Sequence, residues 1–294
     1  MHDPHINRRG IFLMIAGSSF FAANDACSKV ALIHVPPSQI LAVRGAMAAV
    51  LLFTLIAMRG ELSGMRHIFD RRVLLRAGTE AAGTMLYITA LIAMALGDAA
   101  AIMQVGPLVT MAAAVIFFGA KLSWQRWVAV VTGFVGVGLI MKPASGAFQP
   151  IALLPLGVAF LVTFRDFVTG RIGPHIQTLV VTLVTALASM ALGFALSSVE
   201  QWKPLDTAAL IPLALGSLMM VMGHMLTIAA FRGTDPSLIS PFRYSTVVCA
   251  AALGALLFDT VPDLLAIVGM ALIVGAGLYT MHSQRPRTVA KAAA

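Results

Sequence analysis

The sequence predicts an all-α integral membrane protein of ten transmembrane helices, built as two five-helix repeats of inverted topology with both termini in the cytoplasm. Three observations predict this fold: the composition, a series of apolar runs, and the placement of the basic residues. Of the 294 residues, 59% are hydrophobic and 11% are charged, and the mean hydropathy is +0.92. Soluble domains are about 45–50% apolar and about 25% charged, so the composition excludes an ordinary soluble enzyme and a disordered chain.

The apolar residues fall into ten continuous runs, each close to the roughly 20 residues that a membrane-spanning helix needs. The runs are rich in Ala and Leu and do not alternate with polar residues, as the strands of a membrane barrel would. Breaks fall at Pro36-Pro37, Gly173-Pro174 and Asp235-Pro236, and a tight turn falls at Asp98. The predicted spans are 11–34, 38–58, 73–95, 98–119, 124–141, 151–172, 176–198, 205–230, 236–258 and 261–281.

The basic residues set the orientation of these spans. Fifteen of the 20 lysines and arginines lie in alternate breaks or at the adjoining span ends, counted from the N-terminus, whereas only Lys142 and Lys203 lie on the opposite side. Lys29, Arg44 and Arg243 fall within spans, and we expect Arg44 to extend toward the outer interface. Basic residues favour the cytoplasmic side, so the termini are predicted to be cytoplasmic. The net charge of +8 therefore reflects membrane topology, and no nucleic-acid partner is expected.

A weak internal repeat divides the chain. Asp25, Pro36 and Gln39 recur in the same order as Asp166, Pro174 and Gln177, and the turn at Asp98 matches the turn at Asp235. The same register sets Tyr87 opposite His224. Because five is odd, the second repeat enters the membrane in the opposite orientation, which is typical of secondary transporters. The predicted segments are 1–10 (cytoplasmic), 11–141 (first repeat), 142–150 (linker), 151–281 (second repeat) and 282–294 (basic cytoplasmic tail).

Glycines mark the last span of each repeat. Gly133 and Gly136 in the fifth span, and Ala271 and Gly275 in the tenth, have the spacing of small residues that let helices approach closely. We interpret these two spans as a scaffold or a dimer contact.

Three segments resemble the EamA family of the drug/metabolite transporter superfamily. They are Asn24-Asp25-Ala26-Cys27-Ser28-Lys29, Trp124-Gln125-Arg126-Trp127, and Pro241-Phe242-Arg243-Tyr244 followed by Val261-Pro262-Asp263. The resemblance covers essentially the whole chain and implies a ten-helix carrier with a five-plus-five inverted repeat. Such carriers usually have an acidic residue after the fourth and ninth spans, and here the first of these places reads Gly119-Ala120-Lys121.

Within the family, the first hypothesis is an amino-acid exporter of the YddG type with broad specificity. The segments around Asp25, Trp124 and Arg243 also look like those of S-adenosylmethionine uptake carriers, and uptake of riboflavin or another metabolite is a further alternative. The expected location is the bacterial inner membrane. The expected partners are a small-molecule substrate and the lipid bilayer, and the chain is either a monomer or a homodimer.

Polar residues inside the spans are the candidate site, because charges in a bilayer are costly and face a cavity or each other. Asp25 and Lys29 lie four residues apart on one face of the first span and form either a structural ion pair or a substrate-binding pair beside Asn24. Glu80 and Tyr87 in the third span and His224 in the eighth are expected to face each other across the repeat axis. Glu80 could pair with Arg76, and His224 could bind a carboxylate or carry a proton.

The remaining candidates lie in the fourth, sixth and ninth spans. Pro107 and Pro241 are predicted to kink their helices and free a carbonyl group. Arg243 is expected to pair with Asp25 or Asp166, or to attract an anionic group. The cavity-lining candidates are Asn24, Asp25, Tyr87, Gln104, Phe164, Asp166, His224 and Tyr244, with Lys29, Glu80 and Arg243 as charge-pairing or coupling residues.

These features favour a secondary carrier that works by alternating access. An intramembrane enzyme is disfavoured because the sequence has no metal-binding cluster, no nucleophile motif and no nucleotide-binding loop. A channel is disfavoured because nothing resembles a selectivity ring. No catalytic residue, metal or cofactor is expected, and Cys27 and Cys249 are interpreted as free thiols in apolar runs.

Overall fold

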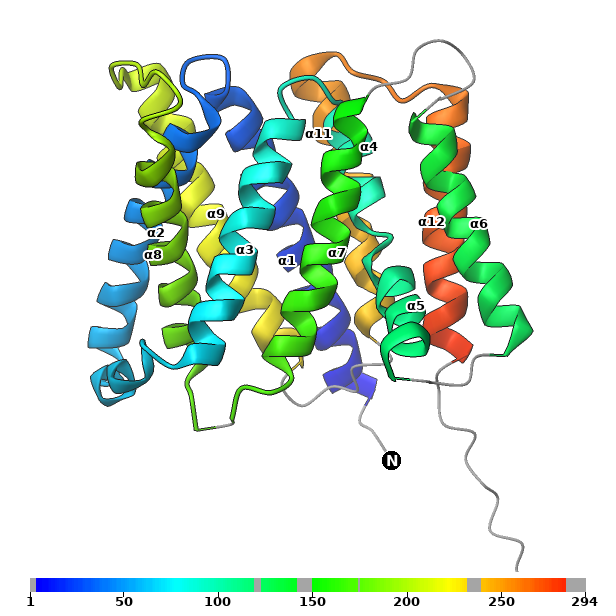
Figure 1. Ribbon diagram of the computed structural model, residues 1–294, viewed down its shortest axis with the longest axis horizontal. Coiled ribbons are helices and arrows are strands. Elements are labelled where there is room, and N and C mark those ends of the chain that lie inside the picture. Colours follow the sequence, from blue (N-terminus) through cyan, green and yellow to red (C-terminus); the bar gives the residue numbers. More distant parts are fainter. Residues whose placement is uncertain (1–3, 119–122, 142–149, 174, 232–238, 284–294) are drawn as a thin grey trace, which may run out of the picture.

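The computed structural model describes residues 4–118, 123–141, 150–173, 175–231 and 239–283, and every regular element among them is a helix (Figure 1). The α-helices stand roughly side by side and cross one slab in alternating directions. The elements are α1 (Pro4–Ala31), α2 (Pro37–Met58), η1 (Leu62–His67), α3 (Arg71–Ala90), α4 (Leu96–Met103), α5 (Gly106–Phe118), α6 (Trp124–Met141), η3 (Pro150–Ala152), α7 (Leu153–Thr169), α8 (Thr178–Leu196), α9 (Thr207–Phe231), η4 (Ser240–Tyr244), α11 (Ser245–Phe258) and α12 (Leu264–Ser283).

These elements account for the ten predicted spans. Within the described ranges, eight helical segments are long and apolar enough to cross a membrane by length and composition, and the apolar part of α12, Leu264–Thr280, is shorter. The third span, α3, falls outside that group of eight, and its first half carries Arg71, Arg72, Arg76 and Glu80. The start of α1 and the end of α12 lie on the same face of the molecule, as the even number of spans requires (Figure 1). The basic residues make this face the cytoplasmic one.

Aspartates fix where several helices begin. Asp70 Oδ1 accepts hydrogen bonds from the backbone N–H groups of Arg72 and Val73 at the start of α3. Asp206 and Asp263 accept from the backbone three residues later, at the starts of α9 and α12. A side-chain oxygen at this position satisfies a backbone donor that the helix leaves without a partner. The breaks between spans are thus encoded locally in the sequence.

The packing of the helices has a two-fold pattern that agrees with the inverted repeat. Helix α1 packs on α9 as α7 packs on α3, and α2 packs on α9 as α8 packs on α3. The two self-related pairs, α2 with α8 and α6 with α12, also pack together. Exchanging the first five spans for the last five therefore maps one set of contacts onto the other.

Close packing of α6 on α12 supports the scaffold interpretation, with one correction. A Cβ added at Gly136 would come within 2.6 Å of the Gly269 carbonyl oxygen, and one added at Gly269 would come equally close to the Gly136 carbonyl oxygen. Gly133 lies against Leu108. Within the described part of the chain, a Cβ added at Gly275 would meet nothing within 4 Å, so Gly275 does not contribute to the packing of α12 on α6. Gly269 takes that role because it lies on the face of α12 turned toward α6.

The fourth span is broken in the middle. Helix α4 ends at Met103 and α5 begins at Gly106, with Pro107 in its first turn, where a missing N–H costs no hydrogen bond. In the ninth span, Pro241 lies in η4, directly before α11. Gly119-Ala120-Lys121, Lys142, the Asp235-Pro236 turn and residues 142–149 and 284–294 lie outside the described residues.

Candidate functional site

One group of polar side chains joins the first two helices near Arg44. Arg44 Nη1 donates to Asn24 Oδ1 at 3.0 Å and to Ser28 Oγ at 2.8 Å, and Asn24 Nδ2 donates to Asp25 Oδ1 at 2.9 Å. We call Asn24, Asp25, Ser28 and Arg44 the Arg44 cluster. Arg44 is only 6% exposed, so its expected extension to the interface was wrong. The countercharge of Asp25 and the polar groups on α1 hold it inside the protein.

Lys29 does not pair with Asp25. Its Nζ donates to the carbonyl oxygens of Leu91, at 3.2 Å, and Met94, in the turn that ends α3, and lies 5.5 Å from the centre of the Phe258 ring. A lysine ammonium is favourable at the end of a helix, where carbonyl groups lack partners. The four-residue spacing places Asp25 and Lys29 on one face of α1. The Lys29 ammonium nevertheless binds the carbonyl groups at the end of α3, which lie nearer to it. Asp25 instead interacts with Arg44 and with buried Tyr87.

A second group of charges joins α3 to α7. Arg165 Nη1 lies 2.5 Å from Glu80 Oε2, and Arg165 Nη2 lies 2.7 Å from Asp166 Oδ1, which also accepts from Arg165 Nε at 3.0 Å. We call Glu80, Arg165 and Asp166 the Arg165 cluster. The expected partner of Glu80 was Arg76, but Arg76 Nη1 donates to Thr185 Oγ1 on α8 at 2.7 Å. Arg165 reaches Glu80 because α7 packs directly on α3.

The charges near the Arg165 cluster do not balance. The guanidinium groups of Arg76 and Arg243 both interact electrostatically with Arg165, Asp166 and Glu80. Three arginines thus face two carboxylates. Arg243 forms no ion pair with Asp25 or Asp166 within the described part of the chain, so its predicted pairing is replaced by a longer-range attraction to Asp166. The arrangement has spare positive charge for an anionic group.

A small cavity lies between α2, α3, α8 and α9, the four helices related by the repeat. Its volume is about 40 Å³, which is room for water but far below the several hundred Å³ of typical ligand pockets. The expected opposition of the third and eighth spans is present here, because Glu80 and His224 line the same cavity. The lining residues are Arg44, Gly45, Glu80, Thr84, Thr182, Thr185, Ala186, Ser189, Met220 and His224.

His224 and Tyr87 have different surroundings although the repeat relates them. The His224 ring lies edge-on to Phe21, with ring centroids 5.0 Å apart, and interacts with Glu80 across the cavity. The Tyr87 hydroxyl is buried beside Asp25 and does not line this cavity. His224 is therefore the one of the pair that faces the cavity.

The break in the fourth span contacts the start of the ninth span. Gln104, between α4 and α5, donates from Nε2 to the carbonyl oxygen of Arg243 in η4 at 3.2 Å. Pro107 and Pro241 flank this contact in the sequence. Tyr244 is 4% exposed, and its ring fills the space beside Gly277 of α12, so it packs against the scaffold helix. Discontinuous helices of this kind commonly form binding sites in transporters, because they expose backbone groups inside the membrane.

Phe164 does not fit its predicted role. The side chain is 48% exposed, on the same face of α7 as Phe160, and it lines neither described cavity. Its neighbour Arg165 turns inward instead. Sequence reasoning also missed the hydroxyl stripe on α8, where Thr178, Thr182, Thr185 and Ser189 recur at helical spacing. That periodicity was readable from the sequence, whereas the inward turn of Arg165 depends on the packing of α3.

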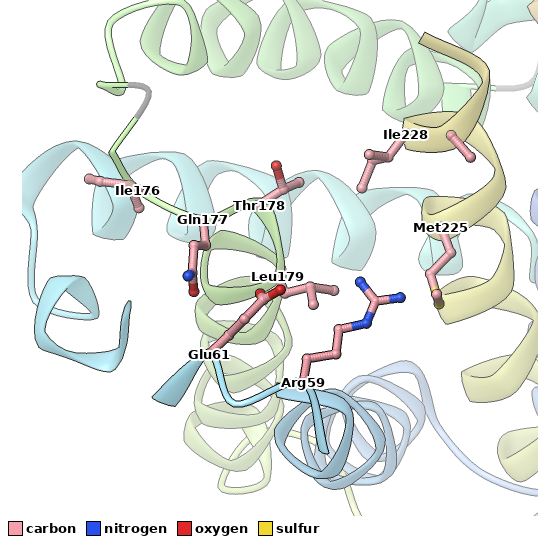
Figure 2. Close-up of a pocket in the computed structure, with 9 residues that line it drawn as sticks. Arg59, Glu61, Ile176, Gln177, Thr178, Leu179, Met225 and Ile228 are labelled. Atoms are coloured by element: carbon pink, nitrogen blue, oxygen red, sulfur yellow. The ribbon is translucent and has the colours of Figure 1, made fainter. Parts of the chain in front are cut away.

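A larger cavity opens at the cytoplasmic end of α2, α8 and α9 (Figure 2). It has a volume of about 360 Å³, within the range of ligand pockets. Arg59 and Glu61 enter it from the end of α2, and Ile176, Gln177 and Leu179 from the start of α8. Met225 and Ile228 of α9 line the opposite wall. The cavity is therefore lined by both charged and apolar side chains.

The described residues contain no group of three or more His, Cys, Asp or Glu side chains that could hold a metal ion. Cys27 and Cys249 are free and partly buried. The site consists of fixed charges and hydrogen-bonding groups around a small central cavity, and the break between α4 and α5 lies in the same molecule. Ten spanning helices with two-fold packing around such a centre define a membrane transporter of the inverted-repeat class.

The chain belongs to the EamA-like transporter family. The family pattern matches residues 8–142 and 149–281, which are the two halves of the chain. The matched pattern is that of a transporter family, and the chain spans about three fifths of the length of the first S-adenosylmethionine uptake transporters that it matches.

Relatives with named substrates are distant. The S-adenosylmethionine uptake transporter of Rickettsia bellii is 26% identical over 61% of this chain and 61% of its own length. The riboflavin transporter of Vibrio cholerae is 24% identical over 97% of this chain and 98% of its own. The pseudopaline exporter of Pseudomonas aeruginosa is 23% identical over 95% of this chain and 98% of its own. The names include both uptake and export.

The fold is also found in a solved crystal structure. That structure aligns with a TM-score of 0.65 and 18% identity, over 95% of this chain and 99% of the other chain. This similarity shows the shared fold alone.

Proposed function

We propose that the protein is a secondary transporter in the bacterial inner membrane for a metabolite that carries an α-amino-acid group, either a free amino acid or S-adenosylmethionine. The observation that carries the proposal is the unbalanced charge around the Arg165 cluster. Arg76, Arg165 and Arg243 exceed Glu80 and Asp166 by one positive charge, which suits a substrate carboxylate. Glu80, 24% exposed at its side chain, and Asp166, 49% exposed, are available to an ammonium group.

Opposite charges placed close together recognise a zwitterion better than an uncharged ring system. Arginine binds carboxylates through a planar fork of donors, and a carboxylate accepts from an ammonium in the same site. The soft apolar wall next to the charges, which includes Met220, suits side chains of several shapes. Broad amino-acid export and S-adenosylmethionine uptake are both consistent with this arrangement.

The test is transport into liposomes that contain the purified protein. Labelled leucine, phenylalanine, glutamate, lysine, S-adenosylmethionine and riboflavin are offered, each with and without a pH gradient. Saturable entry of amino acids or S-adenosylmethionine is expected, with an Arg165→Gln variant as the site control and an Arg171→Gln variant as the matched surface control. Entry of riboflavin alone would contradict the proposed head group while keeping the transporter class. A comparison of inside-out and right-side-out vesicles then assigns the direction.

A further inference from the structure

The outer end of α2 is hydrogen-bonded to the segment between α8 and α9. Gln39 Nε2 donates to the carbonyl oxygen of Lys203 at 2.7 Å, and the Lys203 backbone N–H donates to Gln39 Oε1 at 2.9 Å. Beside them, the Ser38 backbone N–H donates to Glu200 Oε2 at 2.8 Å, and Trp202 Nε1 donates to Ser38 Oγ at 2.9 Å. We call these four hydrogen bonds the outer gate. Gln39 is 2% exposed, so its amide is shielded from water at this end of the molecule.

The repeat places a second glutamine at the opposite membrane face. Gln177 stands directly before α8, Gln39 lies in the first turn of α2, and the two residues are 138 positions apart. The same separation relates Lys203 to Met65, and the separation of 136 between the helix-starting Asp70 and Asp206 relates Lys203 to His67, so the counterpart of Lys203 lies in η1. Gln177 therefore lies at the cytoplasmic end, in the position that Gln39 occupies at the outer end.

The two glutamines differ in their bonding. Both polar atoms of Gln39 are used, whereas Gln177 Oε1 is buried and has no hydrogen-bond partner among the described residues. The Gln177 amide already lies against η1, because a Cβ at Gly64 would collide with Oε1. A buried amide oxygen without a partner is costly. The backbone of η1, which includes Gly64, is the counterpart of the loop backbone that satisfies Gln39.

The cavity of about 360 Å³ lies where the inner counterpart of the outer gate would close (Figure 2). Arg59 and Glu61 line it from the end of α2, and Gln177 lines it from the start of α8. One end of the α2, α8 and α9 group is thus sealed by hydrogen bonds and the other end is open. This is the arrangement expected of a carrier in its inward-open state.

We propose that Gln39 and Gln177 are the repeat-related gating residues of the transport reaction. In the state described here Gln39 holds the outer end closed, and the cavity in Figure 2 is the open cytoplasmic entrance. In the opposite state Gln39 releases Lys203, and Gln177 closes the entrance by hydrogen-bonding to the backbone of η1. Because one pair of backbone hydrogen bonds is exchanged for another, the two states stay close in free energy, as a carrier requires. The inference needs only the transporter class and does not depend on the substrate.

The experiment measures which face is open. In a Cys27→Ala/Cys249→Ala background, Ala229→Cys reports on the inner cavity, which Ala229 lines, and Ala209→Cys reports on the outer side, where Ala209 is fully buried. Each single cysteine is labelled with a membrane-impermeant maleimide, Cys at 229 in inside-out vesicles and Cys at 209 in right-side-out vesicles. When Gln39 and Gln177 are unchanged, the maleimide should label position 229 fast and position 209 slowly.

The two glutamine variants should act in opposite directions. Gln39→Ala should raise labelling at 209 and lower it at 229, each by about threefold to tenfold. Gln177→Ala should leave 229 reactive and lower labelling at 209 further. Trp202→Phe, which removes one outer-gate bond from the partner side, should shift labelling as Gln39→Ala does.

Matched controls separate gating from general loosening. Gln201→Ala changes an exposed glutamine of the same outer loop, and Gln125→Ala changes an exposed glutamine at the cytoplasmic start of α6. Neither should move the labelling at either position. The proposal is overturned if both gate variants shift labelling in the same direction, or if Gln39→Ala and Trp202→Phe leave both positions unchanged in protein that elutes as a single folded species.

Discussion

The Arg44 cluster and the Arg165 cluster each place an arginine within the membrane, but the surroundings of the two arginines differ. Arg44 is 6% exposed and its hydrogen bonds go to Asn24 and Ser28, with Asp25 as countercharge. Arg165 is also paired, but its partners Glu80 and Asp166 are 24% and 49% exposed at their side chains. The first group is enclosed and close to neutral, whereas the second is open and surrounded by excess positive charge. We infer that the first cluster holds the helices and the second meets the substrate.

The largest expected effect is on stability when the enclosed arginine is removed. Arg44→Ala leaves Asp25 without its countercharge inside the protein, and breaking a buried pair costs about 3–5 kcal/mol. The midpoint of thermal unfolding in detergent should fall by many degrees, while Arg9→Ala at the exposed start of α1 should change it little. Joining Asp25→Asn to Arg44→Met should recover part of the loss. No recovery would mean that Arg44 acts through packing alone.

Glu80→Gln should have the next largest effect, on transport. Loss of a charged hydrogen bond is worth about 1.5–3 kcal/mol, so the transport rate at low substrate should fall by about tenfold to a hundredfold. The unfolding midpoint should change far less than in Arg44→Ala, because Arg165 keeps Asp166 and contact with water. Initial rates in liposomes and melting curves on the same preparation check this. If Glu80→Gln unfolds as readily as Arg44→Ala, the contrast between the two clusters is lost.

Asn24→Ala tests whether the Arg44 cluster stabilises the fold or binds the substrate. It removes one acceptor from Arg44 and one donor from Asp25, and an unsatisfied buried group costs about 1–3 kcal/mol. We expect a moderate loss of stability with an unchanged KM for transport. Phe12→Leu, at an exposed side chain of the same helix, is the control. A raised KM with unchanged stability would instead place Asn24 in the substrate site.

The smallest effect is expected at the crossing of the broken helices. Gln104→Ala removes the hydrogen bond to the Arg243 carbonyl, worth about 0.5–1.5 kcal/mol. Transport should slow by about twofold to tenfold, because the position of Arg243 near the Arg165 cluster becomes less defined. Gln125→Ala on α6 should transport normally. A Gln104→Ala protein with normal rates at all substrate concentrations would show that this contact does not position Arg243.

The fold was readable from the sequence because a membrane constrains it so strongly. Span length, apolar composition and the bias of basic residues are local properties, and they predicted ten spans and a shared face for the two ends. Helix ends at Asp70, Asp206 and Asp263 follow from local hydrogen bonding. Repeated Asp25 and Gln39 pointed to the inverted repeat. The split between α4 and α5 was only partly anticipated, from Pro107.

The tertiary structure decided which residues the polar side chains bind, because a charge inside a membrane protein pairs with the nearest group on a neighbouring helix. Lys29 has Asp25 one turn away, yet it binds the end of α3. Glu80 has Arg76 one turn away, yet it binds Arg165 on α7. Gln39 and Gln177 are related by the repeat, and only the conformation gives Gln39 two hydrogen bonds and leaves Gln177 Oε1 without a partner among the described residues. The sequence determined which polar residues enter the membrane, and the packing of helices distant in sequence decided what each of them does there.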